Sequence, residues 1–377
     1  MNTAFVYRIE PSFDQQILIN KTFGCRRFIY NKMLEDKINY YETHKTMLKT
    51  YPSQYKDWYV FLNEVDATAL VSSQNDLEIA YKNFFKKQET GFPKFKKYSF
   101  SASYTTLRVN DNIRIEGEYL KLPKLGFVKI KLHRQIPNNH KIKNVTIRRS
   151  AGGKYSVSIL TEYLAEIKQV TNIGDTIGLD YSLNKLFVSL DETCSYPVIT
   201  KWTTMIEKLN RRLSHTKKDS NNRLKLKLRL GKVYDKITNI KKDFLHKKST
   251  EIANRYDLVS IENLNLKSMT ETNQKSISRK VFSTGWGMFK EMLSYKLKLR
   301  GKHLEVIPKY YPSSKTCCHC GQIHQELKLS DRVFKCPKCS NVLDRDINAS
   351  INISIQGMTQ YAKNLIQRTV GHTGIAL

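Results

Sequence analysis

The sequence predicts an α+β multidomain protein, and three changes of pattern along the chain indicate it. From residue 12 to about residue 87, apolar residues recur at helical spacing. Between residues 99 and 166 the pattern changes to short alternating stretches separated by turn residues, which is typical of antiparallel strands. After residue 176, apolar strands alternate with long helices. A chain of 377 residues can hold two or three domains, each with its own core.

The first predicted elements are a short strand and a helical region. Residues 4–9 alternate between apolar and other side chains, which predicts a strand. Pro11 and Ser12 then open a helical pattern. This pattern continues to about Lys87, and residues 91–93, Gly-Phe-Pro, break it.

Six strand-like stretches come next, and together they predict a small antiparallel barrel. Turn residues such as Gly117, Gly126 and Pro137 separate them. The six predicted strands are residues 104–109, 112–115, 119–122, 127–132, 143–149 and 155–162.

The third region begins at Thr176 with an apolar strand, and a tight turn joins it to a second strand. Two long basic helices follow and read as an antiparallel pair around a polar turn. In chain order, the predicted elements are a strand that begins at 176 and ends before Asp180, a strand at 186–190, helices at 202–213 and 223–255, a strand at 257–261, a helix at 285–300 and a strand at 304–308.

The charge of the chain indicates a polyanionic partner. Lys and Arg number 64 against 34 Asp and Glu, which gives a formal net charge of +30. A compact protein tolerates such an excess best when nucleic acid neutralises it. The two basic helices have few acidic residues at helical spacing, so we expect them to contact phosphate, although a solvated surface is the alternative.

Membrane insertion and secretion are disfavoured. No apolar run approaches the roughly 20 residues that a spanning helix needs, and mean hydropathy is −0.50. Residues 1–10 contain no apolar signal core. We therefore expect a cytoplasmic location with reduced thiols.

Three acidic residues stand where a strand ends or a helix begins. Asp180 follows the apolar run 177–179, Glu262 follows residues 258–261, and Asp346 opens the last helical pattern. Alone, each has an ordinary explanation, because Asp forms turns after strands and caps helices at their start.

Two Cys-x-x-Cys pairs predict a structural zinc site. Cys317 with Cys320, and Cys336 with Cys339, can place four thiolates tetrahedrally around Zn²⁺. A disulfide or redox role is disfavoured in a reducing compartment. Adjacent Cys317 and Cys318 cannot easily both bind, so the pair with two residues between is preferred. His319 and His324 are the reserve ligands.

The order of the three acids resembles that of an RNase H-like nuclease of the RuvC type. That resemblance implies that Asp180, Glu262 and Asp346 converge to hold two divalent ions on a scissile phosphate. Oxygen ligands suit Mg²⁺, or Mn²⁺ as a substitute, better than zinc.

Further motifs, over nearly the whole chain, resemble the TnpB family, the OrfB-type proteins of bacterial insertion sequences related to type V CRISPR effectors. The most specific are Tyr-Pro-Ser-Ser-Lys-Thr-Cys at 311–317 and Asp-Arg-Asp-Ile-Asn-Ala at 344–349. Similar segments lie at 7–11, 23–31, 80–85, 92–96 and 122–126. The chain departs from the usual pattern at Cys318 and Ser350.

The resemblance implies a domain layout. It comprises a wedge β-barrel domain (1–10 and 98–170), a helical recognition lobe (11–97), a RuvC-like nuclease domain (171–311 and 341–357), an inserted zinc ribbon that binds target nucleic acid (312–340) and a C-terminal tail (358–377). It also implies a guide RNA derived from the transposon end and double-stranded target DNA, read by base pairing next to a short flanking motif. A bacterial cytoplasmic protein that associates with the nucleoid when it binds DNA is a further implication. Aromatic rings among basic residues, such as those from Phe92 to Tyr98 and Tyr104, are expected either to stack on bases or to pack in the core.

Several alternatives stay open at this point. A guide-bound repressor without cleavage, a strand-joining transposase and a compact type V CRISPR effector each fit the sequence. The sequence also leaves open whether one or two copies bind each RNA. The role of the tail, either mobile or in contact with RNA, is open as well.

Overall fold

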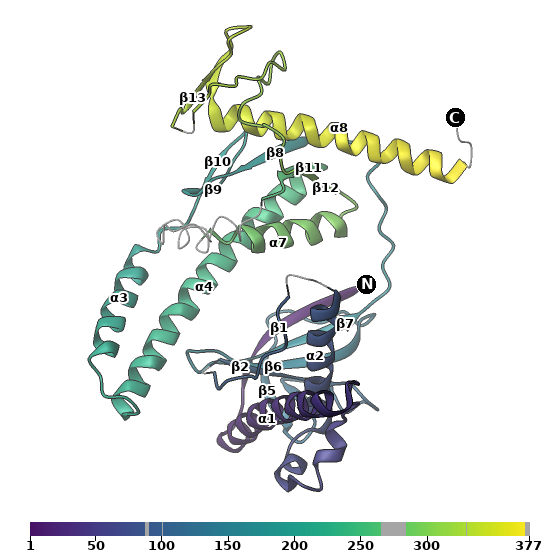
Figure 1. Cartoon of the computed structure of the whole chain (residues 1–377), viewed down its shortest axis with the longest axis vertical. Helices are drawn as coiled ribbons and strands as arrows, with labels where there is room; N and C mark the ends of the chain where they lie inside the picture. Colours follow the sequence, from purple (N-terminus) through teal and green to yellow (C-terminus); the bar gives the residue numbers. More distant parts are fainter. Residues whose placement is uncertain (87–89, 100, 265–283, 329, 374–377) are drawn as a thin grey trace. The chain divides into compact units, whose positions relative to one another are not determined.

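A computed structural model describes residues 1–86, 90–99, 101–264, 284–328 and 330–373, with the backbone alone described for residues 368–373. The chain divides into two compact units (Figure 1). The first comprises residues 1–165 and 201–236, and the second comprises residues 166–200 and 237–377.

A seven-stranded sheet forms the centre of the first unit, and every neighbouring pair in it is antiparallel. All the predicted strands are present. The order β2-β6-β7-β1-β5-β4-β3 ends at β2 and β3, so the described sheet is an open half-barrel and not a closed barrel. The strands are β1 (Asn2–Glu10), β2 (Ala102–Leu107), β3 (Arg114–Glu116), β4 (Tyr119–Leu122), β5 (Gly126–Lys131), β6 (Lys141–Arg149) and β7 (Tyr155–Glu162).

Two long helices of the first unit pack against this sheet and against each other. Helix α1 (Phe13–His44) begins at a capping box, in which Ser12 Oγ accepts from the Gln15 backbone and the Gln15 side chain accepts from the Ser12 backbone. Helix α2 spans Ala67–Lys86. The predicted helical region is interrupted between the two, where residues 45–66 hold only short 3₁₀ turns, Pro52–Tyr55 and Val60–Glu64. Lys87, the predicted helix end, lies outside the described residues.

The core of the first unit follows from the alternation of its strands. Inward side chains of β1, β5, β6 and β7 are buried with the apolar face of α1. Most outward side chains are polar or charged, and Val6 and Phe127 are exposed apolar exceptions. Tyr104 is 2% exposed and packs edge-on against Phe23, so this ring belongs to the core and is not available to stack on a base.

The second unit contains a five-stranded mixed sheet in the order β10-β9-β8-β11-β12. Strands β8, β11 and β12 are parallel to one another, and β9 is antiparallel to both of its neighbours, β8 and β10. The strands are β8 (Thr176–Tyr181), β9 (Lys185–Val188), β10 (Thr193–Ser195), β11 (Leu258–Glu262) and β12 (His303–Ile307). The predicted strands are confirmed within a few residues, and β10 is an addition. A separate small hairpin pairs β13 (Val333–Lys335) with β14 (Val342–Asp344).

Four further helices complete the described chain. Helices α3 (Thr200–Ser214) and α4 (Asn221–Arg255) form the predicted antiparallel pair, and α7 spans Trp286–Leu299 (Figure 1). Helix α8 (Arg345–Thr373) runs well past Gly357, where the sequence shows no clear core pattern. The side chains of Arg368 and His372 in the predicted tail lie outside the described residues. None of the described helices is long and apolar enough to cross a bilayer.

Candidate functional site

Strand β8 carries Asp180 on the face that packs against helix α8. Ile177 and Leu179 are buried on one face of the strand, and Gly178 and Asp180 share the other face because side chains alternate. A Cβ atom at Gly178 would overlap the carbonyl oxygen of Ser350 and lie 2.6 Å from the Ser354 nitrogen. Only glycine therefore lets the α8 backbone approach β8 this closely.

Strand β11 places Glu262 at the same edge of the sheet as Asp180. The two strands are parallel and pair Leu258 with Thr176 through Ile261 with Leu179, so their carboxyl ends lie side by side. Helix α8 also crosses this strand closely, because a Cβ atom at Gly357 would overlap Ser260 Oγ. Ser260 and Glu262 alternate onto one face, which is the face that α8 covers.

Asp346 is supplied by the first turn of α8, where a neighbouring acid acts as the helix cap. Asp344 Oδ1 accepts hydrogen bonds from the backbone nitrogens of Asp346 (2.9 Å) and Ile347 (3.1 Å). Capping therefore does not occupy the carboxylate of Asp346. The ordinary N-cap explanation applies to Asp344 and not to Asp346.

The three predicted acids line one pocket of about 390 Å³. Burial, and after it the negative charges of Glu262 and Asp346, hold the pKa of Asp180 well above its usual range, while Arg345 opposes the shift. The pocket is lined by Asp180, Tyr181, Ser182, Leu183, Asn184, Glu262, Ser313, Ser314, Arg332, Arg345 and Asp346.

The donors in this pocket fit a hard divalent cation. Three carboxylates from separate segments offer oxygen ligands, and no thiol or imidazole of the described residues lines the pocket.

Ser313 is a residue of this site that sequence reasoning did not single out. Its hydroxyl donates to Glu262 Oε1 at 2.5 Å, and the side chain is buried. Its carbonyl accepts at 2.8 Å from Asn352 of α8, which is also buried. The only sequence signal was its place in the Tyr-Pro-Ser-Ser-Lys segment.

Arg332 and Arg345 also line the pocket and were not predicted. The Arg345 guanidinium donates to the Lys328 carbonyl at 3.2 Å and to Ser314 Oγ at 3.3 Å, which fixes it at the pocket wall. Two guanidinium groups beside three carboxylates make a site that can attract a phosphate group as well as cations.

The four predicted cysteines converge on one point. The Sγ atoms of Cys317 and Cys339 are 3.7 Å apart, and those of Cys320 and Cys336 are 3.6 Å apart. Thiolates on a tetrahedral zinc with bonds of about 2.3 Å lie about 3.8 Å from one another, so the group fits a closed zinc site. Cys318 is outside the group, and its Sγ accepts instead from Asn341.

The two halves of the cysteine site have the same backbone geometry. The residue after each second cysteine, Gly321 or Ser340, has a positive φ and donates to the carbonyl of the first cysteine. Asn348 of α8 then clamps the first half, since it accepts from the Cys318 nitrogen and donates to the Thr316 carbonyl. Helix α8 therefore contacts both the cysteine site and the acidic pocket.

Comparisons with known proteins agree with this arrangement. The chain matches the OrfB_IS605 family described as "Probable transposase" over residues 156–273, its associated "Helix-turn-helix domain" over residues 1–46, and the "Cas12f1-like, TNB domain" over residues 286–353. Residues 1–46 form strand β1 followed by helix α1, and not two helices.

Two relatives that match nearly the whole chain show the family. A "Putative RNA-guided DNA endonuclease" of Streptomyces pristinaespiralis is 30% identical over 95% of this chain and 90% of its own length. The chain belongs to the TnpB family. A second TnpB relative, "Putative RNA-guided DNA endonuclease InsQ" of Escherichia coli K12, is 30% identical over 94% of this chain and 92% of its own.

A solved structure shares the fold. The protein in "Cryo-EM structure of the Cas12f1-sgRNA-target DNA complex" matches this TnpB chain with a TM-score of 0.60 at 13% identity. The match covers 94% of this chain and 98% of that one. At this identity the likeness concerns the fold alone.

Proposed function

We propose that the protein is an RNA-guided DNA endonuclease whose acidic pocket hydrolyses the target strand with bound divalent metal. One observation carries the proposal: Asp180, Glu262 and Asp346, from three segments far apart in the sequence, line a single pocket. Close packing through Gly178 and Gly357 holds their three elements together. The relatives named as RNA-guided DNA endonucleases support guide RNA and target DNA as partners.

The residues have distinct roles in this proposal. Asp180, Glu262 and Asp346 would hold the metal, most simply two Mg²⁺ ions. When bound, such a pair activates a water molecule for attack on phosphorus and stabilises the leaving oxygen. Ser313 orients the Glu262 carboxylate, and Arg332 with Arg345 would bind the phosphate oxygens.

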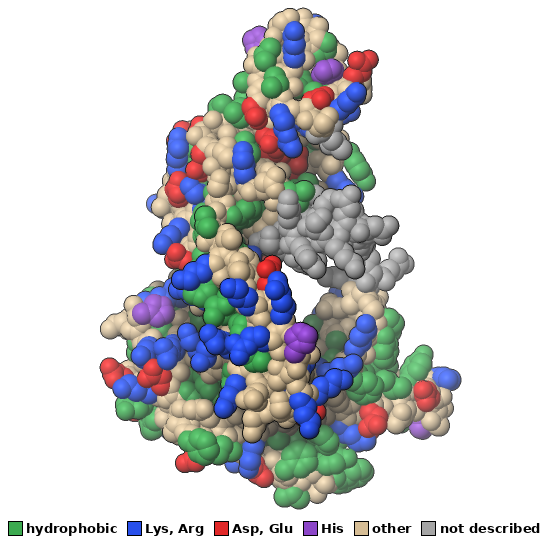
Figure 2. Space-filling view, turned by 90° about the vertical axis from the view of Figure 1, so that its left-hand side faces the viewer, with side chains coloured by type: hydrophobic (Ala, Val, Ile, Leu, Met, Phe, Trp, Pro, Cys, Tyr) green, Lys and Arg blue, Asp and Glu red, His purple; other side chains and the backbone are tan. Residues whose placement is uncertain are grey.

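The cysteine site would bind one structural Zn²⁺ through Cys317, Cys320, Cys336 and Cys339. We also propose the domain layout inferred from the sequence, with the ribbon at 312–340 inserted in the nuclease domain. The large positive charge supports an extended nucleic-acid contact, and Figure 2 shows Lys and Arg side chains gathered in a band with few acids among them.

The test begins with the RNA that copurifies with the chain, which is sequenced and used to design a matching plasmid target. We expect the wild-type complex to cut this plasmid when Mg²⁺ is present. Asp180→Ala should retain RNA and target binding but lose cleavage. Cleavage that survives Asp180→Ala would reject the active site, and binding without any wild-type cleavage would favour a guide-bound repressor. Joined products in place of cut ends would indicate a transposase.

A further inference from the structure

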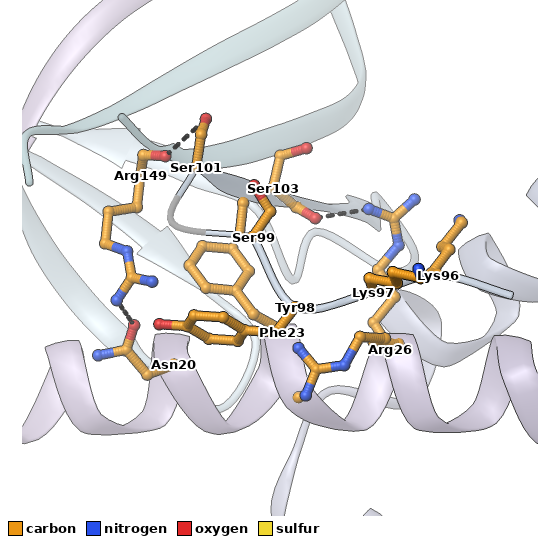
Figure 3. Close-up of a pocket in the computed structure, with 13 residues that line it drawn as sticks. Asn20, Phe23, Arg26, Lys96, Lys97, Tyr98, Ser99, Ser101, Ser103 and Arg149 are labelled. Atoms are coloured by element: carbon orange, nitrogen blue, oxygen red, sulfur yellow. Dashed lines mark hydrogen bonds between the residues drawn. The ribbon is translucent and has the colours of Figure 1, made fainter. Parts of the chain in front are cut away.

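A second pocket, of about 540 Å³, lies within the first unit between helix α1, strand β2 and the end of β6. No Asp or Glu of the described residues lines it, whereas five Lys or Arg residues do. Figure 3 shows Arg149 and Asn20 at one end, Arg26 and Lys96 at the other, and the Tyr98 ring between them. Its volume is in the range of pockets that hold a group the size of a nucleotide.

The wall of this pocket is held in place by hydrogen bonds and ion pairs. Asn31 clamps the backbone of Lys96, donating to its carbonyl at 3.0 Å and accepting from its nitrogen at 2.7 Å. Asp76, just outside the lining, pairs with both Arg26 and Lys96. Arg26 also donates to the Ser103 carbonyl at 2.5 Å. These contacts fix the segment that carries Lys97 and Tyr98 against α1.

Three of the lining cations lack a carboxylate partner among the described residues, namely Arg27, Lys97 and Arg149. Arg149 donates from one terminal nitrogen to Asn20, but its Nε is buried without a partner in the described chain. Asp76 is already shared by two cations, so the pocket retains a positive excess. Phosphate oxygens are the natural ligands for such guanidinium and ammonium groups.

Tyr98 supplies the aromatic surface of the pocket. Tyr98 is 69% exposed, and the Arg27 guanidinium lies 5.5 Å from its ring centroid. This exposure contrasts with Tyr104, on the adjacent strand, which is buried. An exposed ring beside cations that have no carboxylate partner among the described residues suits a nucleotide, because the base can stack on the ring and the phosphate can contact the cations.

We propose that this pocket binds one nucleotide of a nucleic-acid strand, with its base on Tyr98 and its phosphate against Arg27, Lys97 and Arg149. The inference rests on the proposed function for its partner, since a guide-bound nuclease handles both guide RNA and target DNA. Phosphodiester chemistry is common to the two strands, so the experiment has one arm for each.

In the first arm, the copurified RNA, resynthesised with a fluorophore, is titrated with RNA-free protein. In the second, the protein–RNA complex is titrated with labelled matching duplex DNA. The variants are Arg27→Gln, Lys97→Gln, Tyr98→Ala and Tyr98→Phe, and each titration is repeated over a range of salt concentrations. Lys49→Gln is the matched charge control, because Lys49 is an exposed residue of the same unit outside the pocket.

We expect Tyr98→Ala to weaken binding about tenfold in one arm and Tyr98→Phe to restore it. Arg27→Gln and Lys97→Gln should each lower the salt slope in that arm by about one. Loss in the first arm identifies guide RNA as the occupant, and loss in the second alone identifies target DNA. Effects no larger than that of Lys49→Gln in both arms would overturn the proposal.

The failure of this inference differs from the failure of the proposed function. If wild-type complex cuts its target and all four pocket variants bind as wild type does, the pocket assignment is wrong and the nuclease assignment stands. If wild-type protein binds nucleic acid through Tyr98 and Arg27 but never cuts, the nuclease assignment is wrong and the pocket assignment stands. Circular dichroism of each variant, expected to match wild type because these side chains are not in the core, shows that folding is unchanged.

Discussion

Ser313 donates a 2.5 Å hydrogen bond to the Glu262 carboxylate, and its own carbonyl is held by Asn352 of the helix that carries Asp346. The segment bearing Ser313 therefore ties two of the three acids to one another. Glu262 reaches the pocket from the end of a strand. Without the hydrogen bond from Ser313, its side chain could adopt several rotamers. Residues that orient metal ligands in this way affect affinity for the metal without touching it.

Ser313→Ala should therefore either lower the cleavage rate or raise the Mg²⁺ concentration needed for half-maximal cleavage, by about 10- to 100-fold. Target binding should not change, because Ser313 is buried and acts through Glu262. Single-turnover cleavage over a Mg²⁺ titration measures this effect. Ser330→Ala, at an exposed position, is the control. Wild-type Mg²⁺ dependence in Ser313→Ala would show that the hydrogen bond has no role.

Gly178→Ala should destabilise the second unit and abolish cleavage. The added methyl group would overlap the backbone of α8 at Ser350, and backbone cannot move aside as a side chain can. Overpacking of this kind costs about 1–3 kcal/mol. Thermal unfolding and cleavage are the measurements.

Gly287→Ala is the matched control, because Gly287 lies in helix α7 with nothing within 4 Å of the added Cβ. It should stabilise the helix by about 0.5 kcal/mol. If the two alanine variants behave alike, the close approach of α8 to β8 does not hold in solution.

The first part of the fold was predictable because local signals determine it. The Ser12 capping box starts α1, and the alternating apolar residues of β4 and β7 give their bounds. The interruption at residues 45–66 was not predicted, because its apolar residues, such as Tyr55 and Leu62, also pack in the core. The sequence predicted a barrel, but the sheet is open. Whether a sheet closes depends on which strands pair over long range, and the pattern within each strand does not determine that pairing.

The end of α8 escaped prediction for a different reason. Past Gly357, polar groups supply many of its contacts, since Gln360 donates to Glu305 at 3.1 Å and Tyr361 contacts His303. Hydrophobic periodicity cannot reveal such contacts. The acids and cysteines were recognisable by type and order, whereas Ser313 was not, because a serine in a loop has many ordinary roles.

Zinc content should distinguish the adjacent cysteines. Cys317→Ser should lower bound zinc from about one ion per chain to near zero, whereas Cys318→Ser should retain it, because only Cys317 belongs to the four-thiol group. Metal analysis of the purified variants gives the result directly. Retention of zinc in Cys317→Ser together with its loss in Cys318→Ser would mean that the ligands are assigned wrongly.

Stability should depend on pH through the buried Lys296. Its ammonium donates to the His246 carbonyl, Ser249 and Thr250, while burial lowers its pKa to about 8. Between pH 8 and about 10.5 the unfolded chain then holds more protons than the folded chain, so stability contributed by this group rises with pH. Below pH 8 the cost of burying the charge is constant.

Denaturant unfolding of wild type and Lys296→Met over this range isolates the effect, because other groups cancel in the difference. We expect wild type to gain stability relative to the variant as pH rises from 8 to 10.5. If the free energy of unfolding of wild type minus that of Lys296→Met stays constant or falls over this range, Lys296 is not desolvated as described.

The most direct test of the account compares two acids that stand two residues apart. Asp344 caps helix α8 and Asp346 lines the pocket. Asn at position 344 therefore preserves the cap, whereas Asn at position 346 removes a charged ligand of the proposed metal site. In single-turnover plasmid cleavage by the RNA-bound protein, Asp344→Asn should cut within a few-fold of wild type and Asp346→Asn should lose at least about a thousandfold. Equal rates for the two variants, or the greater loss at Asp344, would contradict the claim that Asp180, Glu262 and Asp346 form one catalytic site.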